Sequence, residues 1–147
     1  MPSSKRLFVK TSTLPNAGKG LFAKVAIAKK EIVTEYTGDL RTWKEVEDDS
    51  DNGYIFHIND EAVIDASKHP KSFGRYANDA AGLQRVKGIR NNAEYVEDGT
   101  RVFLVAKTDI PAGGEIFVSY GPQYWKQVRE NIRFDREAAK EQSKPKR

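Results

Sequence analysis

The stretch "VFLVAKTDIPAGGEIFVSYG", residues 102–121, carries the strongest structural signal in the chain. Its nearly continuous apolar run at 102–106 predicts a strand that is buried on both faces. The segment "DIPAGGE", with one proline and two glycines, predicts a turn, and "IFVSY" at 116–120 predicts a final strand. No histidine or cysteine lies in this stretch. The end of this strand is therefore either a site built from tyrosines, without an imidazole or a thiolate, or only the edge of a core.

Short strands separated by turns account for most of the remaining chain. They are predicted from β-branched and aromatic residues that are bounded by turn residues. The predicted strands are 6–13, two within 21–36 that divide at 29–30, 54–58, 61–66, 92–97 and 101–107. The last two should form a hairpin around the dipeptide Asp98-Gly99, and 37–40 should be a turn. The fold class is therefore mostly β.

Helix is expected in only two places. Thr42 and Glu45 stand three residues apart, which is typical of a capping box, and predict a short helix at 43–48. Apolar residues recur at helical spacing from Tyr124 onward and predict a C-terminal helix. We expect one domain at 1–125, followed by this C-terminal helix and a basic tail at 126–147.

The composition is typical of a modest globular domain. The chain has 147 residues, 38% of them apolar, and no run long enough to span a membrane. Its N-terminus lacks the apolar stretch of a signal peptide. The absence of cysteine excludes disulfides, cysteine-ligated zinc and a thiol nucleophile, and fits an intracellular protein, in the cytoplasm or the nucleus.

The net charge of +4 belongs to the C-terminal tail. Residues 126–147 contain eight Lys/Arg and four Asp/Glu, whereas the rest of the chain contains 17 of each. A neutral body argues against a dedicated nucleic-acid-binding domain. The tail could still contact nucleic acid, although a solvated tail is the simpler interpretation.

Four stretches together resemble the SET-domain family of protein lysine methyltransferases. They are "NAGKGLFA" at 16–23, "GRYAND" at 74–79, "NNAEYV" at 91–96 and the stretch at 102–121. The first of them is followed by the strand that ends in "EYTGDL" at 35–40. The resemblance covers roughly residues 7 to 125. It implies a β-clip fold in which the C-terminal segment makes a knot-like crossing. Without cysteine clusters, the chain is similar to the compact, stand-alone forms of the family.

The resemblance also implies a reaction. S-adenosylmethionine would be the methyl donor, and a lysine side chain of a protein, for example in a histone tail, would be the acceptor. Lysine has a pKa near 10.4, so a neutral amine at pH 7 costs roughly 4–5 kcal/mol. An apolar channel disfavours the ammonium form. By family correspondence, Tyr120 lies nearest the chemistry and Tyr36 lines the lysine channel, and neither role needs a metal.

The family also assigns residues to substrate and cofactor. Val118 by itself would leave room for a second or third methyl group. Tyr95, however, would limit the number of methyl groups, so monomethylation is expected. Glycines would let the cofactor approach the backbone closely. The positions that would bind the cofactor are Gly18, Lys19, Gly20, Leu21, Tyr54, Arg75, Tyr76, Asn78, Asp79 and Trp125. Trp125 could stack on the adenine or pack the C-terminal helix.

One position departs from the family pattern and leaves an alternative open. The family has Asn-His-Ser where this chain has Asn78-Asp79-Ala80. Asp79 could keep the main-chain contact to adenine, or the domain could have lost catalysis and serve as a binding module. His57 and His69 lack ligand-like spacing, so structural roles are expected for both. The acidic run at 45–51 could be a solvated loop or could recognise a basic peptide.

Overall fold

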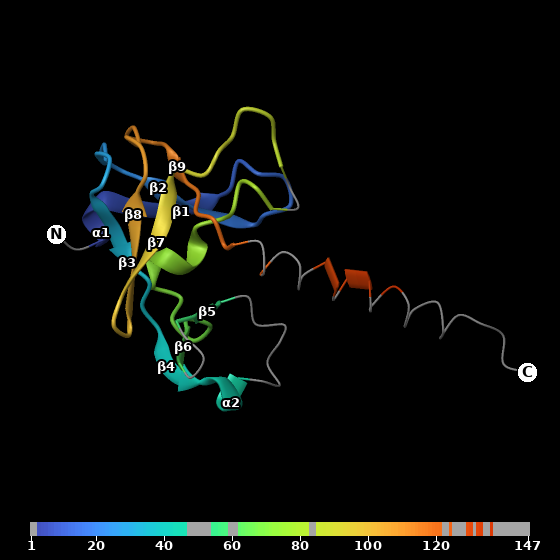
Figure 1. Ribbon diagram of the computed structural model, residues 1–147. Coiled ribbons are helices and arrows are strands. Elements are labelled where there is room, and N and C mark those ends of the chain that lie inside the picture. Colours follow the sequence, from blue (N-terminus) through green and yellow to red (C-terminus); the bar gives the residue numbers. More distant parts are fainter. Residues whose placement is uncertain are drawn as a thin grey trace, which may run out of the picture.

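Nine short strands form three separate antiparallel sheets in the part of the chain that the structure describes. The structure is a computed structural model, and it describes residues 3–46, 54–58, 62–82, 85–121, 124, 129–130, 132–133 and 136. The sheets, in strand order, are β1 (Leu7–Thr11), β2 (Lys19–Ala23) and β9 (Glu115–Ile116); β3 (Ile32–Glu35), β8 (Arg101–Ala106) and β7 (Ala93–Asp98); and β4 (Asp39–Thr42), β6 (Ala62–Asp65) and β5 (Ile55–His57). Figure 1 shows the third sheet at one end of the molecule and the other two at the opposite end.

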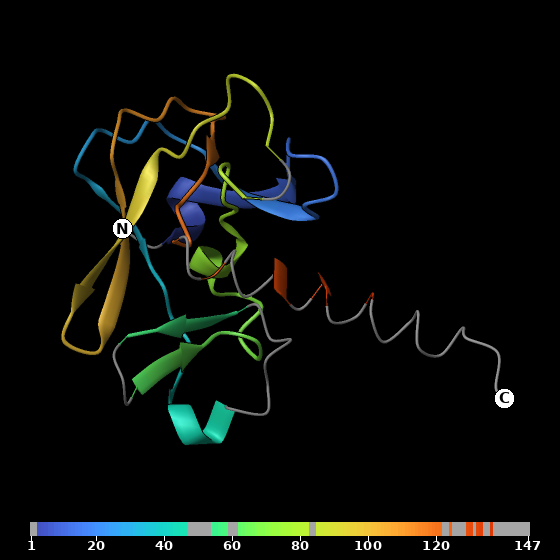
Figure 2. The same cartoon turned by 45° about the vertical axis from the view of Figure 1, so that its right-hand side comes forward.

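Helical structure within the described ranges is brief. It consists of α1 (Ser3–Arg6), α2 (Trp43–Val46) and the 3₁₀ turn η1 (Phe73–Tyr76). Figure 2 shows the turn η1 between the two groups of sheets and α2 beside the third sheet. No helix among the described residues is long and apolar enough to cross a membrane.

The core lies between the first two sheets and extends to Ile64 of β6 in the third. Leu7, Leu21, Val102, Leu104 and Ile116 are each at most 1% exposed and belong to one cluster. Because β1, β2 and β9 supply three of them and β8 the other two, burial of these side chains fastens the two sheets together.

Several local predictions are confirmed. The strands β7 and β8 pair from Ala93↔Ala106 to Asp98↔Arg101, so the hairpin turns where the Asp-Gly dipeptide predicted it. The capping box is present as well. The Glu45 amide donates to Thr42 Oγ1 at 3.2 Å, and the Thr42 amide donates to Glu45 Oε1 at 2.9 Å.

Other predictions were wrong. The strand at 101–106 is not buried on both faces, because Val102, Leu104 and Ala106 alternate with more exposed residues. The segment 37–40 is only partly a turn, since β4 begins at Asp39. The last strand covers only Glu115–Ile116, because the residues after it bond to two different chain segments instead of continuing along β2.

The C-terminal segment makes the predicted crossing. Phe117 bridges Asn78 in parallel, and Val118 bridges Ala93 in parallel. The Val118 amide donates to the Asn78 carbonyl on one side, and the Phe117 carbonyl accepts from the Asn92 amide on the other, both at 2.9 Å. The segment therefore lies between 78 and 92–93. Beyond it, the described residues 124, 129–130, 132–133 and 136 are helical, as the sequence predicts for the C-terminus.

Candidate active site

Tyr120 lies at the end of the crossing, where both ends of the residue are fixed. Its hydroxyl donates to the Ala77 carbonyl, and its amide donates to Asp79 Oδ2 at 2.9 Å. Burial raises the pKa of the Tyr120 phenol well above its usual value, and the neighbouring Tyr124 and Asp79 raise it further. Tyr124 also packs edge-on against the ring, with a centroid distance of 4.9 Å. Tyr120 is therefore a neutral phenol at physiological pH.

Tyr36 is a second buried phenol, and its hydroxyl proton is also used in a hydrogen bond to a backbone carbonyl. It directly follows β3 and is only 5% exposed. Its hydroxyl donates to the Tyr54 carbonyl at 2.6 Å. Burial raises its pKa, and the carboxylate of Asp65 adds to this effect.

Tyr36, Phe56 and Tyr95 form an aromatic cluster. The ring centroids are 5.9 Å apart for Tyr36 and Phe56, 6.1 Å for Tyr36 and Tyr95, and 4.7 Å for Phe56 and Tyr95. Burial also raises the pKa of Tyr95, and Tyr120 is the next largest cause. The structure thus brings together the three tyrosines that the sequence assigned to the lysine site. Phe56 was not predicted from the sequence as part of this cluster. It could have been found from its position two residues after Tyr54, because residues i and i+2 lie on the same side of an extended chain.

The hydrogen bonds of Tyr36 and Tyr120 determine what their oxygens can do. A phenol has one proton to donate and lone pairs to accept. In both residues a backbone carbonyl takes that proton. Each oxygen can therefore meet a further group only as an acceptor, which suits a group with N–H donors.

The predicted cofactor residues near β2 are joined to the crossing. Asn78 Nδ2 donates to the Lys19 carbonyl at 2.9 Å. Gly18 has φ +68°, with open space where a side chain would begin, so this position favours glycine and leaves room beside the backbone. Leu21 is fully buried within β2, so any contribution from it to a ligand is limited to main-chain atoms.

Gly20 is required for a different reason than the sequence suggested. A Cβ on Gly20 would lie 2.4 Å from Glu115 Oε2. That carboxylate accepts from Ser12 Oγ at 2.6 Å and from the Thr13 amide at 2.8 Å. The absence of a side chain at Gly20 therefore makes room for a buried carboxylate, not only for a ligand.

Arg75 connects two more of the predicted cofactor residues. Its guanidinium lies 4.1 Å from the ring centroid of Tyr54 and 5.0 Å from that of Tyr76. Nη1 donates to the carbonyls of Ala66 and Ser67, at 2.8 and 3.1 Å. Nε is buried and has no hydrogen-bond partner among the described residues. One donor of Arg75 is therefore left over beside Tyr54.

The other predicted residues are placed less directly. Val118 is fully buried in the core cluster against which Tyr95 and Tyr120 pack. Trp125 lies outside the described residues, as does most of the acidic run at 45–51. The ring of His57 packs against that of Trp43 at a tilt of 41°, with a centroid distance of 4.0 Å. His69 Nε2 lies 2.9 Å from Asp39 Oδ1, so both histidines have structural contacts.

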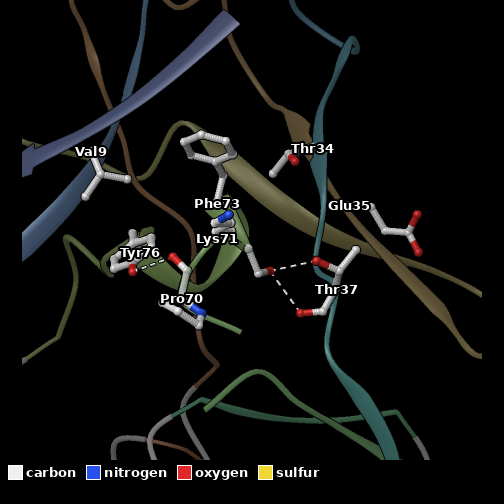
Figure 3. A pocket seen from close by; sticks show the side chains of 9 residues that line it. Val9, Thr34, Glu35, Thr37, Pro70, Lys71, Phe73 and Tyr76 are labelled. Carbon is white, nitrogen blue, oxygen red and sulfur yellow. Dashed lines mark hydrogen bonds between the residues drawn. The ribbon is translucent and has the colours of Figure 1, made fainter. Parts of the chain in front are cut away.

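A hollow of about 630 Å³ opens beside β3 and η1 (Figure 3). Its lining comes from β1, β3 and the segment that leads into η1. Of the predicted site residues only Tyr76 borders it, and the hydroxyl of Tyr76 donates to the Pro70 carbonyl at 2.7 Å. Tyr36, Tyr95 and Tyr120 are therefore not among the residues that line this hollow.

Comparisons with known proteins agree with this fold. A family model described as "SET domain" matches residues 18–121. The histone-lysine N-methyltransferase MEDEA of Arabidopsis thaliana is 31% identical over 123 residues, which cover 77% of this chain and 17% of that protein. The histone-lysine N-methyltransferase EZ1 of Zea mays is 30% identical over 112 residues, which cover 71% of this chain and 11% of that protein.

A solved structure is similar over most of the chain. It is a humanized mutant of the Chaetomium thermophilum Polycomb Repressive Complex 2 bound to the inhibitor GSK126, with a TM-score of 0.64 and 28% sequence identity. The match covers 84% of this chain and 16% of that chain. Like the two plant proteins, this structure is much longer than the matched region. The shared part is the domain itself, and the chain belongs to the SET domain family.

Proposed function

We propose that this protein transfers a methyl group from S-adenosylmethionine to the side-chain amine of lysine in a protein substrate. The observation that carries the proposal is the pair Tyr36 and Tyr120. Both are neutral phenols whose protons are held by backbone carbonyls, and Tyr36 packs against the aromatic cluster with Tyr95 and Phe56. Proteins with basic tails such as histones, inside the cell, are the substrate class we expect.

The aromatic rings suit the stem and the head of a lysine. They offer apolar surface to the methylene chain, and this surface disfavours the charged ammonium. The acceptor oxygens of Tyr36 and Tyr120 can take N–H groups of the amine. Because those N–H groups are then fixed, the lone pair is aimed in one direction, and alignment of this kind can lower a barrier by several kcal/mol.

The raised pKa values bear on where the proton goes. A phenol whose pKa lies above its usual value of about 10 is protonated at pH 7. Tyr120 is then a poor general base, and its own proton already bonds to Ala77. We therefore propose that the lysine proton leaves to water, and that Tyr120 orients the amine.

The described residues fit the methyl donor. SET methyltransferases generally use S-adenosylmethionine, which supplies a methyl group on a positively charged sulfur when it is bound. The Nε of Arg75, which has no hydrogen-bond partner in the described part of the chain and lies beside Tyr54, would bind a carboxylate such as that of an amino-acid ligand. Gly18, with open space beside its backbone, and Asn78 would hold the remainder of the ligand.

The proposal is tested by methyl transfer from labelled S-adenosylmethionine to histones and to cell extract. Tyr120→Phe removes the acceptor oxygen and should abolish transfer, whereas Arg6→Gln removes an exposed ion pair with Glu31 and should leave it intact. Equal melting temperatures would show that both variants fold. Calorimetry with S-adenosylhomocysteine separates the alternative, because a binding module without catalysis would take up the ligand and transfer no methyl group.

A further inference from the structure

Asp79 is a buried carboxylate that joins three segments of the chain. It is 6% exposed. Its Oδ2 accepts the Tyr120 amide at 2.9 Å, and its Oδ1 accepts the Ala81 amide at 2.8 Å and Asn91 Nδ2 at 2.9 Å. Both oxygens are therefore occupied by donors, and one of those donors belongs to the residue nearest the proposed chemistry.

Only a carboxylate can satisfy this set of donors. Ionised aspartate accepts on both oxygens, whereas asparagine has one acceptor and one NH₂ donor. An asparagine at 79 would turn its oxygen toward the two donors of Ala81 and Asn91. Its NH₂ group would then face the amide of Tyr120, two donors would oppose each other, and the contact would be lost.

The segment 77–79 fixes Tyr120 at both ends. The hydroxyl is bonded to the Ala77 carbonyl and the amide to the Asp79 side chain. A change in the amide contact therefore tilts a ring whose hydroxyl is anchored only two residues away from Asp79. Small displacements of an orienting group can lower a rate on the order of 100-fold.

Asn91 holds Asp79 in this arrangement. In addition to its bond to Asp79, Asn91 accepts the Ala80 amide on Oδ1 at 2.8 Å. These contacts close the base of the loop that runs from 79 to 91. The next residue, Asn92, bonds to the crossing segment through the Phe117 amide and the Glu115 carbonyl. Two neighbouring residues therefore hold the site together, because Asn91 orients Asp79 and Asn92 binds the crossing segment.

We infer that Asp79 is a positioning residue for methyl transfer, which orients Tyr120 through its main-chain amide and is itself held by Asn91. The inference rests on the proposed function for its kinetic part only. Asp79 stands where the family pattern has histidine, and by this inference it has a structural role that supports catalysis.

The test compares wild type, Asp79→Asn and the exchanged pair Asp79→Asn with Asn91→Asp. In the single variant the Tyr120 contact is lost, so kcat should fall on the order of 10- to 100-fold with little change in KM for a lysine peptide. In the exchanged pair, the NH₂ of residue 79 donates to a carboxylate at 91, and the oxygen of residue 79 turns back to the Tyr120 amide. The Ala81 amide loses its acceptor in this variant, so kcat should recover in large part but not fully. A kcat for Asp79→Asn equal to that of wild type, or a folded exchanged pair without recovery, would overturn the inference.

Amide hydrogen exchange at Tyr120, measured by NMR, provides a readout that needs no activity. We expect slow exchange in wild type, fast exchange in Asp79→Asn and slow exchange again in the exchanged pair. If exchange is the same in all three proteins, the contact does not position Tyr120 and the inference fails. If exchange follows this pattern but wild type transfers no methyl group, the positioning contact stands and the proposed function fails.

Discussion

Replacement of Gly20 by alanine should destabilise the protein in the absence of any ligand. The new Cβ would lie 2.4 Å from Glu115 Oε2 and 3.2 Å from the backbone Cα of Ser12. The carboxylate must move, and its bond to Ser12 Oγ is the first to be lost. A hydrogen bond to a charged group contributes about 1.5–3 kcal/mol, and overpacking costs about 1–3 kcal/mol. Alanine recovers about 0.5–1 kcal/mol of chain entropy. The net loss should be about 2–5 kcal/mol.

Urea denaturation of four proteins measures this coupling as a double-mutant cycle. They are wild type, Gly20→Ala, Glu115→Ala and the double variant. Because the clash is mainly with the Glu115 side chain, Gly20→Ala should cost much less when Glu115 is already alanine. The coupling free energy should be at least about 1 kcal/mol, as is usual for residues in contact.

Gly18→Ala is the matched control. Gly18 also has no side chain and lies two residues away, but its cost comes from φ +68° and not from a neighbour. Its effect should therefore add to that of Glu115→Ala without coupling. Additive behaviour of Gly20→Ala would refute the clash. If Gly20→Ala leaves stability unchanged but weakens S-adenosylhomocysteine binding, glycine is required at this position for cofactor binding, as the sequence suggested.

Three further outcomes are expected. Burial raises the pKa of Tyr36, Tyr95 and Tyr120, so above pH 10 the unfolded chain loses protons that the folded protein keeps. The unfolding free energy should then fall by about 1.4 kcal/mol per pH unit for each phenol, and a flat profile in urea titrations from pH 9 to 11 would contradict this. Tyr95→Phe should shift the product toward dimethyl-lysine, and an unchanged distribution by mass spectrometry would remove Tyr95 from product control. Arg75→Met keeps an apolar stem but loses the donors beside Tyr54, so S-adenosylhomocysteine should bind about tenfold more weakly by calorimetry. An equal affinity would exclude Arg75 from the site.

The features that were predicted correctly from sequence depend on neighbours in the chain. The hairpin turn at Asp98-Gly99 and the capping box of Thr42 and Glu45 are determined by residues within a few positions of each other. The end of β9 is determined by residues far away in the sequence, because Ile116 pairs with Leu21 whereas Phe117 bonds to Asn92. Periodicity reports that a segment is apolar and extended, but it does not report which partner each residue takes.

The same distinction explains why the tyrosines were predicted and their supports were not. Tyr36, Tyr95 and Tyr120 stand in recognisable motifs, and the structure brings them together. What fixes Tyr120, however, is the side chain of Asp79, 41 residues earlier, and what holds Asp79 is Asn91. The aspartate looked like a defect in a motif as long as its partners were unknown. A buried carboxylate is costly unless it is hydrogen-bonded. The donors from Tyr120, Ala81 and Asn91 therefore turn the apparent defect into a reason for the residue to be there.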